Sequence, residues 1–225
     1  MKETRWFLCL TALAVFTNFG SPARAAVIVA SPAFPPIGED FIAPPAATFF
    51  FPIAGGVEVG HLVLKPISPG PIIPSPPDDE TVVFDVLLLG DLSVGGAPVG
   101  PVSSTGPAMT VLLGKLGHVT GSFDTEMLSM SLTGVTPLGP FMIRESPTLA
   151  STGKTSITDI GGGLYKIDSF FDVFTELSID GGSTWTPSAG PPVHFELGGP
   201  VPEPTALGLL GLSLLGALRR SRRAA

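Results

Sequence analysis

Much of the chain alternates between apolar and polar residues with the two-residue period of a β-strand. The longest example covers residues 165–180, where apolar side chains at nearly every second position are separated mainly by charged ones. Shorter examples are Val57–Leu64 and Leu128–Leu132. Successive side chains of a strand point to opposite faces, so these segments predict strands with one buried face.

Three further observations refine this pattern. The run Thr81–Leu89 is almost continuously apolar, which indicates a more deeply buried strand. The alternation after Tyr165 is longer than a usual strand, so we expect a bend or bulge near Ser169 and Phe170. Outside the two ends of the chain, no comparable window has a strong 3.6-residue period. The sequence predicts an all-β domain, an antiparallel β-sandwich or jelly-roll, flanked by an N-terminal signal helix and a short C-terminal transmembrane helix.

Glycine and proline punctuate these segments. The chain has 28 glycines and 25 prolines among 225 residues, without a collagen-like period. The prolines concentrate in residues 31–79, the N-terminal part of the body. We therefore expect much of Ser31–Phe51 and Pro66–Asp79 to be extended or irregular connections.

The first residues have the order of a secretory signal peptide. Lys2 and Arg5 precede the apolar run 6–16, and an Ala-Arg-Ala site ends at Ala25. The apolar run is shorter than the roughly 20 residues of a stable membrane span, so a permanent anchor is the weaker interpretation. Residues 1–25 are predicted to be removed by cleavage between Ala25 and Ala26, which leaves a mature chain without cysteine.

The last residues contain three elements in a fixed order. A Val-Pro-Glu-Pro motif comes first, an apolar stretch covers residues 205–218, and an arginine cluster follows. The residues of the motif and of the cluster are Val201, Pro202, Glu203, Pro204, Arg219, Arg220, Arg222 and Arg223. The prolines hold Glu203 outside helical geometry. The short apolar stretch suits temporary residence in a membrane, and the arginines keep its end in the cytoplasm.

This tail, residues 201–225, resembles the PEP-CTERM sorting domain of exported proteins in Gram-negative bacteria that make exopolysaccharide. The resemblance implies recognition by an exosortase-like intramembrane protease, cleavage near the Pro-Glu-Pro triplet, and transfer of the body to the cell surface or extracellular matrix. The same tail is also labelled an ice-binding protein C-terminal domain, a label that is no evidence of ice binding. An ordinary single-pass anchor is the alternative.

The body, residues 26–200, is long enough for one domain with a hydrophobic core. It contains 17 acidic residues against five basic ones, which gives a net charge of −12. A field of that sign excludes general binding to nucleic acid. No cofactor is predicted.

The sharpest internal motif is an Asp-box, Ser-x-Asp-x-Gly-x-Thr-Trp, a pattern typical of hairpin turns. It is formed by Ser178, Asp180, Gly182, Thr184 and Trp185. The carboxylate can accept bonds from backbone N–H groups of the turn, and the glycines permit positive φ. The box resembles those of sialidases, where it recurs on propeller blades away from the catalytic centre. It occurs once here, and Arg144 is the single arginine of the body. We therefore expect a structural role.

Other candidates for chemistry are weaker. His61, His118 and His194 lie far apart without metal-ligand spacing, so ordinary hydrogen-bonded histidines are favoured. The acidic run 78–80 lacks calcium-loop spacing. The Thr-Gly-Lys-Thr segment 152–155 lacks the first glycine of a phosphate-binding loop. Asp168 and Asp172 share a strand face and could in principle serve glycoside hydrolysis.

The sequence thus predicts an exported, non-enzymatic structural or binding protein of the cell surface or exopolysaccharide matrix. An extracellular carbohydrate-active enzyme or a glycan-binding module is the alternative. Expected partners are the secretion translocon, signal peptidase, the exosortase-like protease and extracellular polysaccharide. The expected location is transiently the inner membrane of a Gram-negative bacterium, then its surface or matrix.

Overall fold

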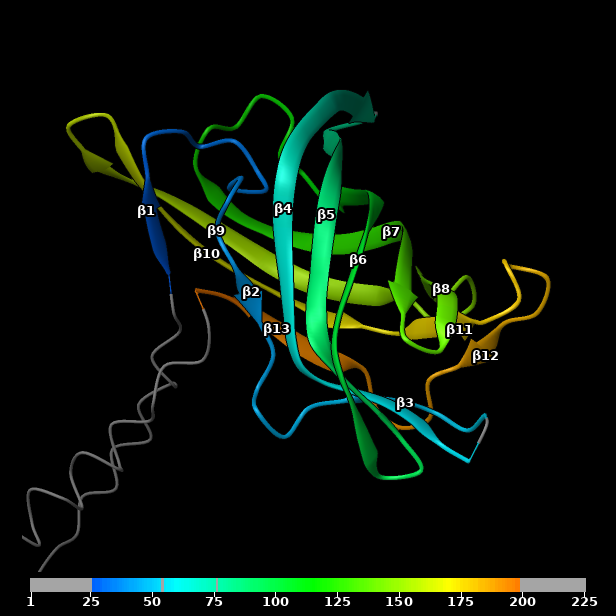
Figure 1. Cartoon of the computed structure of the whole chain (residues 1–225). Helices are drawn as coiled ribbons and strands as arrows, with labels where there is room; N and C mark the ends of the chain where they lie inside the picture. Colours follow the sequence, from blue (N-terminus) through cyan, green and yellow to red (C-terminus); the bar gives the residue numbers. More distant parts are fainter. Residues whose placement is uncertain (1–25, 54, 76, 199–225) are drawn as a thin grey trace, which may run out of the picture. The chain divides into compact units, whose positions relative to one another are not determined.

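The computed structural model describes residues 26–53, 55–75 and 77–198. These residues form thirteen antiparallel strands in one sheet (Figure 1). The strands are β1 (Val27–Val29), β2 (Phe41–Ile42), β3 (Phe49–Phe51), β4 (Val57–Ser75), β5 (Asp79–Val94), β6 (Ala97–Leu112), β7 (Gly121–Thr136), β8 (Gly139–Glu145), β9 (Ser151–Gly161), β10 (Leu164–Val173), β11 (Thr175–Ser178), β12 (Thr186–Pro187) and β13 (Val193–Leu197). Within the described ranges, no helix is long and apolar enough to cross a membrane. The predicted signal and tail helices lie outside them.

The strand pairings close on themselves. Starting from β4, each strand pairs with the next in the order β4, β5, β6, β7, β9, β10, β13 and β2. Strand β2 then pairs with β4 again, which closes the ring. Strand β9 makes the closing link, because it pairs with β7 along one edge and with β10 along the other. In Figure 1, β4, β5 and β6 run side by side, and β7, β9 and β10 cross behind them.

This closure refines the predicted architecture. The all-β, antiparallel prediction is confirmed. A sandwich has two separately hydrogen-bonded sheets, whereas the described strands belong to one. The reason lies in long strands that change partners along their length: the first half of β7, Gly121–Met127, pairs with β9, and its second half, Ser131–Thr136, pairs with β8. Alternation predicts which side chains point inward, but it does not reveal such a change of partner.

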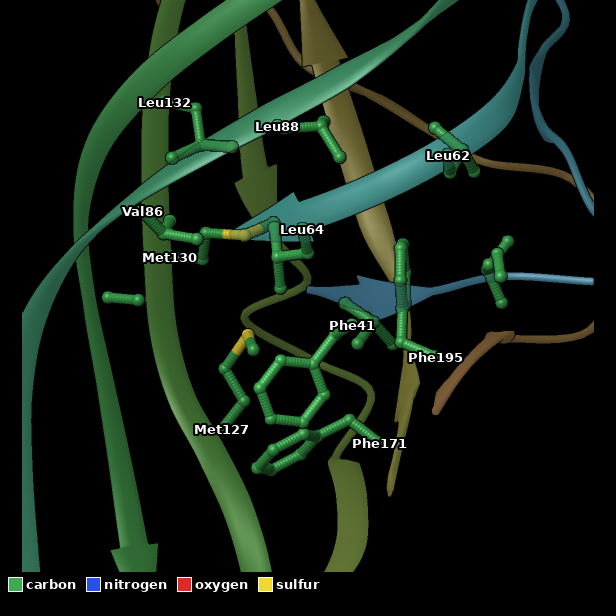
Figure 2. Packing of buried hydrophobic residues seen from close by; sticks show 14 of the residues in the cluster. Phe41, Leu62, Leu64, Val86, Leu88, Met127, Met130, Leu132, Phe171 and Phe195 are labelled. Atoms are coloured by element: carbon green, nitrogen blue, oxygen red, sulfur yellow. The ribbon is translucent and has the colours of Figure 1, made fainter. Parts of the chain in front are cut away.

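The core lies inside this ring. Inward-facing side chains of β4, β5, β7, β10 and β13 interdigitate there, as Figure 2 shows for Leu62, Val86, Met130 and Phe195. Phe41 and Phe171 are tilted against each other with ring centroids 6.0 Å apart. All described strands and this core lie within a single compact unit, which has the properties of a domain that folds on its own.

The proline-rich stretch after Pro66 corrects one prediction. We expected much of Pro66–Asp79 to be an extended or irregular connection, yet Pro66–Ser75 are a paired part of β4, and Asp79 begins β5. Residues 68–75 pair with β5 along one side, and the structure pairs no described strand with their other side. An edge tolerates proline because its missing N–H leaves no neighbour unbonded. By contrast, residues 31–51 are mostly loops around the short strands β2 and β3, as predicted.

A second correction concerns the long alternating segment. We expected a bend or bulge near Ser169 and Phe170, but β10 keeps a regular register with β9 there. Ser169 is fully buried on the core face, where its hydroxyl lies 2.9 Å from that of Thr155. Because the two hydroxyls satisfy each other, the polar residue does not break the strand. The interruption falls later, at Phe174 between β10 and β11.

Candidate functional site

The predicted sorting residues fall outside the described part of the chain. This applies to the motif 201–204, to the arginines of 219–223 and to Ala25. Ala26, expected as the mature N-terminus, immediately precedes β1. The geometry of the structure therefore concerns the body.

The Asp-box forms a turn between β11 and β12 that is organised around Asp180. One carboxylate oxygen of Asp180 accepts the backbone N–H of Thr184 at 2.9 Å and the hydroxyl of Ser178 at 2.8 Å. The other accepts the hydroxyl of Thr184 at 2.6 Å. These bonds, with those from Thr184 the strongest, lower the pKa of Asp180 from 3.8 to about 2.

Two further side chains complete the turn. The hydroxyl of Ser178 accepts the backbone N–H of Gly182 at 2.8 Å, and the indole of Trp185 donates to the Gly182 carbonyl at 3.0 Å. Gly182 has a φ of +88°, in the left-handed region that favours glycine. All five residues of the motif thus contribute to one closed set of local bonds.

Arg144 connects this turn to the sheet. Its guanidinium stacks on the ring of Trp185 at 4.0 Å from the centroid. Its Nε and Nη2 donate to one oxygen of Glu176, at 2.9 and 2.6 Å. Arg144 on β8 lies opposite Glu176 on β11, so strand register places the pair. A charge-assisted pair and a cation–π contact give the single arginine of the body a structural use.

Two of the three histidines pair with individual carboxylates. His61 lies 3.0 Å from Asp91, and His194 lies 2.8 Å from Asp172, in each case nitrogen to carboxylate oxygen. His118 is in the loop between β6 and β7. Among the described residues, no three His, Cys, Asp or Glu side chains gather in a group that could hold a metal ion.

The acidic run 78–80 and the lysine of segment 152–155 make structural contacts. Asp79 accepts the backbone N–H of Gly114 at 2.8 Å, and Glu80 forms an ion pair with the buried Lys115 at 3.2 Å. Lys154 lies within β9 and pairs with Asp124 on β7 at 2.9 Å. A lysine in mid-strand does not stand in a loop before a helix, as phosphate binding of that type requires.

Sequence reasoning missed a buried carboxylic acid, Glu145, at the end of β8. Its side chain accepts the hydroxyl of Ser151 at 3.0 Å. Burial, more than the nearby carboxylates of Glu126 and Glu176, raises the pKa of Glu145 from 4.5 to about 7. Its position at a strand end, next to a loop, carried no distinctive pattern in the sequence.

Sequence reasoning also missed an apolar pocket of about 250 Å³, which we term the rim pocket. It is bounded by β4, β5, β6, the β7–β8 hairpin and the segment that leads into the Asp-box. Its lining consists of Val57, Val59, Leu92, Val94, Val102, Thr136, Leu138, Gly139, Pro140, Phe141, Ile143, Leu177 and Ile179. The individual strands were predictable, but a pocket that joins residues 57 and 179 depends on how strands far apart in the sequence come together.

Comparison with known proteins addresses the tail alone. No curated protein and no solved structure matches the chain. A family model described as the PEP-CTERM protein-sorting motif matches residues 200–223, the segment identified above from its triplet, apolar stretch and arginines. The match does not confirm the ice-binding label. Its description indicates export and sorting through an exosortase. The chain therefore carries a PEP-CTERM protein-sorting motif at residues 200–223.

Proposed function

We propose that the chain is a non-enzymatic structural or binding component of the cell surface or exopolysaccharide matrix of a Gram-negative bacterium. The sorting motif at residues 200–223 is the observation that carries the proposal. According to this proposal, the translocon and signal peptidase export the chain, and an exosortase-like protease processes it near Pro202-Glu203-Pro204. The β-domain is the part delivered.

The use of the body's charged groups supports a non-catalytic role. Asp180 and Glu176 in and beside the Asp-box accept bonds that hold the turn, and Arg144 is stacked on Trp185. Hydrolysis of a glycoside needs a pair of carboxylic groups flanking the bond, one as acid and one as base or nucleophile. A carboxylate that holds a turn in place is poorly suited to either task.

The outer face of β10 and β13 favours a glycan-binding module as a second candidate. Phe170 and His194 lie ring to ring on this face, with centroids 5.1 Å apart. Asp172 contacts His194 there, and Glu196 lies opposite Phe170 in the register. An aromatic ring beside carboxylates can offer apolar contact to a sugar ring and accept hydrogen bonds from its hydroxyls.

A matrix pull-down tests both candidates. Purified body, residues 26–200, is incubated with exopolysaccharide from an exosortase-containing host and with a panel of neutral and acidic glycans. Retention on the matrix supports a binding component, and Phe170→Ala is expected to weaken it at least tenfold if the outer face is the contact. Leu128→Ala, an exposed apolar position on β7, is the matched control.

Glycan turnover by the purified body would overturn the non-enzymatic assignment. Retention that is unchanged in the Phe170→Ala variant would remove the outer face of β10 and β13 as the contact. Absence of both retention and turnover would contradict a role in the matrix.

A further inference from the structure

The rim pocket differs from the rest of the surface in its chemistry. None of its thirteen lining residues carries a charge, and Thr136 is the one hydroxyl among them. That hydroxyl donates to the Gly139 carbonyl at 3.0 Å and accepts the Leu138 N–H at 3.1 Å. A polar or charged ligand group placed here would therefore lose its bonds to water without regaining them from side chains.

The walls of the pocket are fixed by strand pairing. Val57 lies directly opposite Val94, and Val59 opposite Leu92, on the paired strands β4 and β5. Across the pocket Ile143 lies opposite Leu177, on β8 and β11. Both pairs of strands are held by backbone hydrogen bonds, so the pocket exists before any ligand arrives. A preformed site spares the ligand the cost of ordering its walls.

The aromatic wall has a specific cause as well. The ring of Phe141 packs over Gly134 of β7, where a Cβ would lie only 2.5 Å from the ring. Glycine at this position gives the ring the space it occupies. Phe141 is 8% exposed, so it forms wall and not rim.

The mouth of the pocket is unusually apolar. Leu138, at the tip of the β7–β8 hairpin, is 68% exposed, and Ile179, inside the Asp-box, is 58% exposed. Both line the pocket, so each of these two turns contributes an exposed apolar side chain to its rim. The bonds of Asp180 therefore also hold one side of the mouth, which gives the structural Asp-box a connection to binding.

The size of the pocket limits what it can hold. A dry apolar cavity of roughly 150 Å³ accommodates benzene. The rim pocket has about 250 Å³. In proportion, it has room for about ten carbon atoms.

We infer that the rim pocket binds a small uncharged apolar molecule, such as a short alkyl chain or a substituted aromatic ring. This site is independent of the sorting motif and of the outer face of β10 and β13. Sorting and glycan retention can each fail without affecting it.

Methyl-group NMR tests the inference directly, because valine, leucine and isoleucine dominate the lining. The body labelled at these methyls is titrated with toluene and with 1-octanol, and sorbitol serves as the polar control. Both apolar probes are expected to cause saturable shifts at Val57, Leu92 and Ile143, and none at Ile167 and Leu197 of the main core. The full chain in lipid nanodiscs is expected to show the same set of shifts.

Variants distinguish binding in the pocket from nonspecific adsorption of the probes. Val102→Phe fills the pocket and is expected to weaken the binding of both apolar probes at least tenfold. Val119→Phe, the same change at an exposed loop position, is expected to leave their binding unchanged. Val94→Phe, at a half-buried position of the wall, provides a second filled pocket if Val102→Phe does not fold. Shifts that do not saturate, that spread over all methyls, or that persist in both filled variants would overturn the inference.

Discussion

Asp180 holds the Asp-box turn together through the hydrogen bonds of its side chain. Its carboxylate accepts two bonds from Thr184 and one from Ser178. They stabilise the ionised form, so the folded state keeps Asp180 charged at a pH where the unfolded chain is protonated. The stability that results is present above pH 3.8 and is lost as the pH falls towards about 2.

We predict that Asp180→Ala lowers the melting temperature at pH 7 and that this difference narrows between pH 4 and pH 2. Thermal unfolding followed by circular dichroism measures both. Asp159→Ala is the control, because the Asp159 carboxylate accepts the backbone N–H of Gly161 at the exposed end of β9, and this change should lower the melting temperature less. An unchanged melting temperature combined with lost glycan retention would assign Asp180 to binding instead.

The pKa of Glu145 is shifted in the opposite direction to that of Asp180. Burial raises its pKa to about 7, so between pH 4.5 and 7 the unfolded chain releases this proton before the folded chain does. The free energy of unfolding therefore falls as the pH rises through this window and stays low above it.

We predict that Glu145→Gln is more stable than the wild type at pH 8, by on the order of 1–3 kcal/mol, and no more stable at pH 4. Glutamine keeps an acceptor for the Ser151 hydroxyl. Urea unfolding at the two pH values measures the free energy of unfolding of the variant and of the wild type. A gain of equal size at both would show that ionisation is not the cause.

For single residues, contacts between partners close together in the sequence could be predicted, and contacts between distant partners could not. The bonds of Asp180 join residues 178–184, so the motif alone indicates them. Glu145 depends on Ser151 across a loop and on burial by other strands, and Arg144 meets Glu176 32 residues away. Such contacts leave no local pattern.

Among the elements, β9 has the most consequential position because it closes the ring. At Gly153, β9 passes so close to β10 that an added Cβ would overlap the carbonyl of Phe170. This glycine is therefore required by the approach of two backbones.

We predict that Gly153→Ala lowers the melting temperature substantially, because it forces β9 away from β10. Gly60→Ala is the matched control on β4, where the added Cβ would make an ordinary contact with Thr48 at 3.4 Å. Differential scanning calorimetry compares the two. Equal losses in both variants would show that closure by β9 is not a distinctive source of stability.

The strands themselves were predictable where one face is buried. Val57–Leu64, Thr81–Leu89 and Leu128–Leu132 all fall within strands of the structure. The proline-rich end of β4 was not predictable, because composition there favours loops and only the absence of a partner along one edge permits a strand. The closure of the ring of strands could not be predicted from the sequence either, because it depends on where long strands change partners.

For the whole molecule, the predicted signal peptide fixes where the mature chain begins. We predict that exported protein starts at Ala26, one residue before β1. Cleavage there would leave every described strand in the mature protein. Terminal sequencing of the exported protein measures this, and a retained Met1 would contradict it.

We propose that the sorting motif determines where the folded body is delivered, and that this depends on Pro202-Glu203-Pro204 and the arginines after residue 218. The decisive variant replaces the triplet with three alanines, in a host that has an exosortase. Its control replaces Pro191 and Pro192 of the body with alanine. Replacement of the four arginines by serine should separately release unprocessed protein, because orientation of the tail is lost.

Mass spectrometry of cell-surface and inner-membrane fractions gives the most direct measurement. The wild type and the control are expected at the surface, shortened near the triplet. The alanine variant is expected at full C-terminal length in the inner membrane. If the alanine variant instead reaches the surface and is shortened like the wild type, the motif is not the sorting signal of this chain.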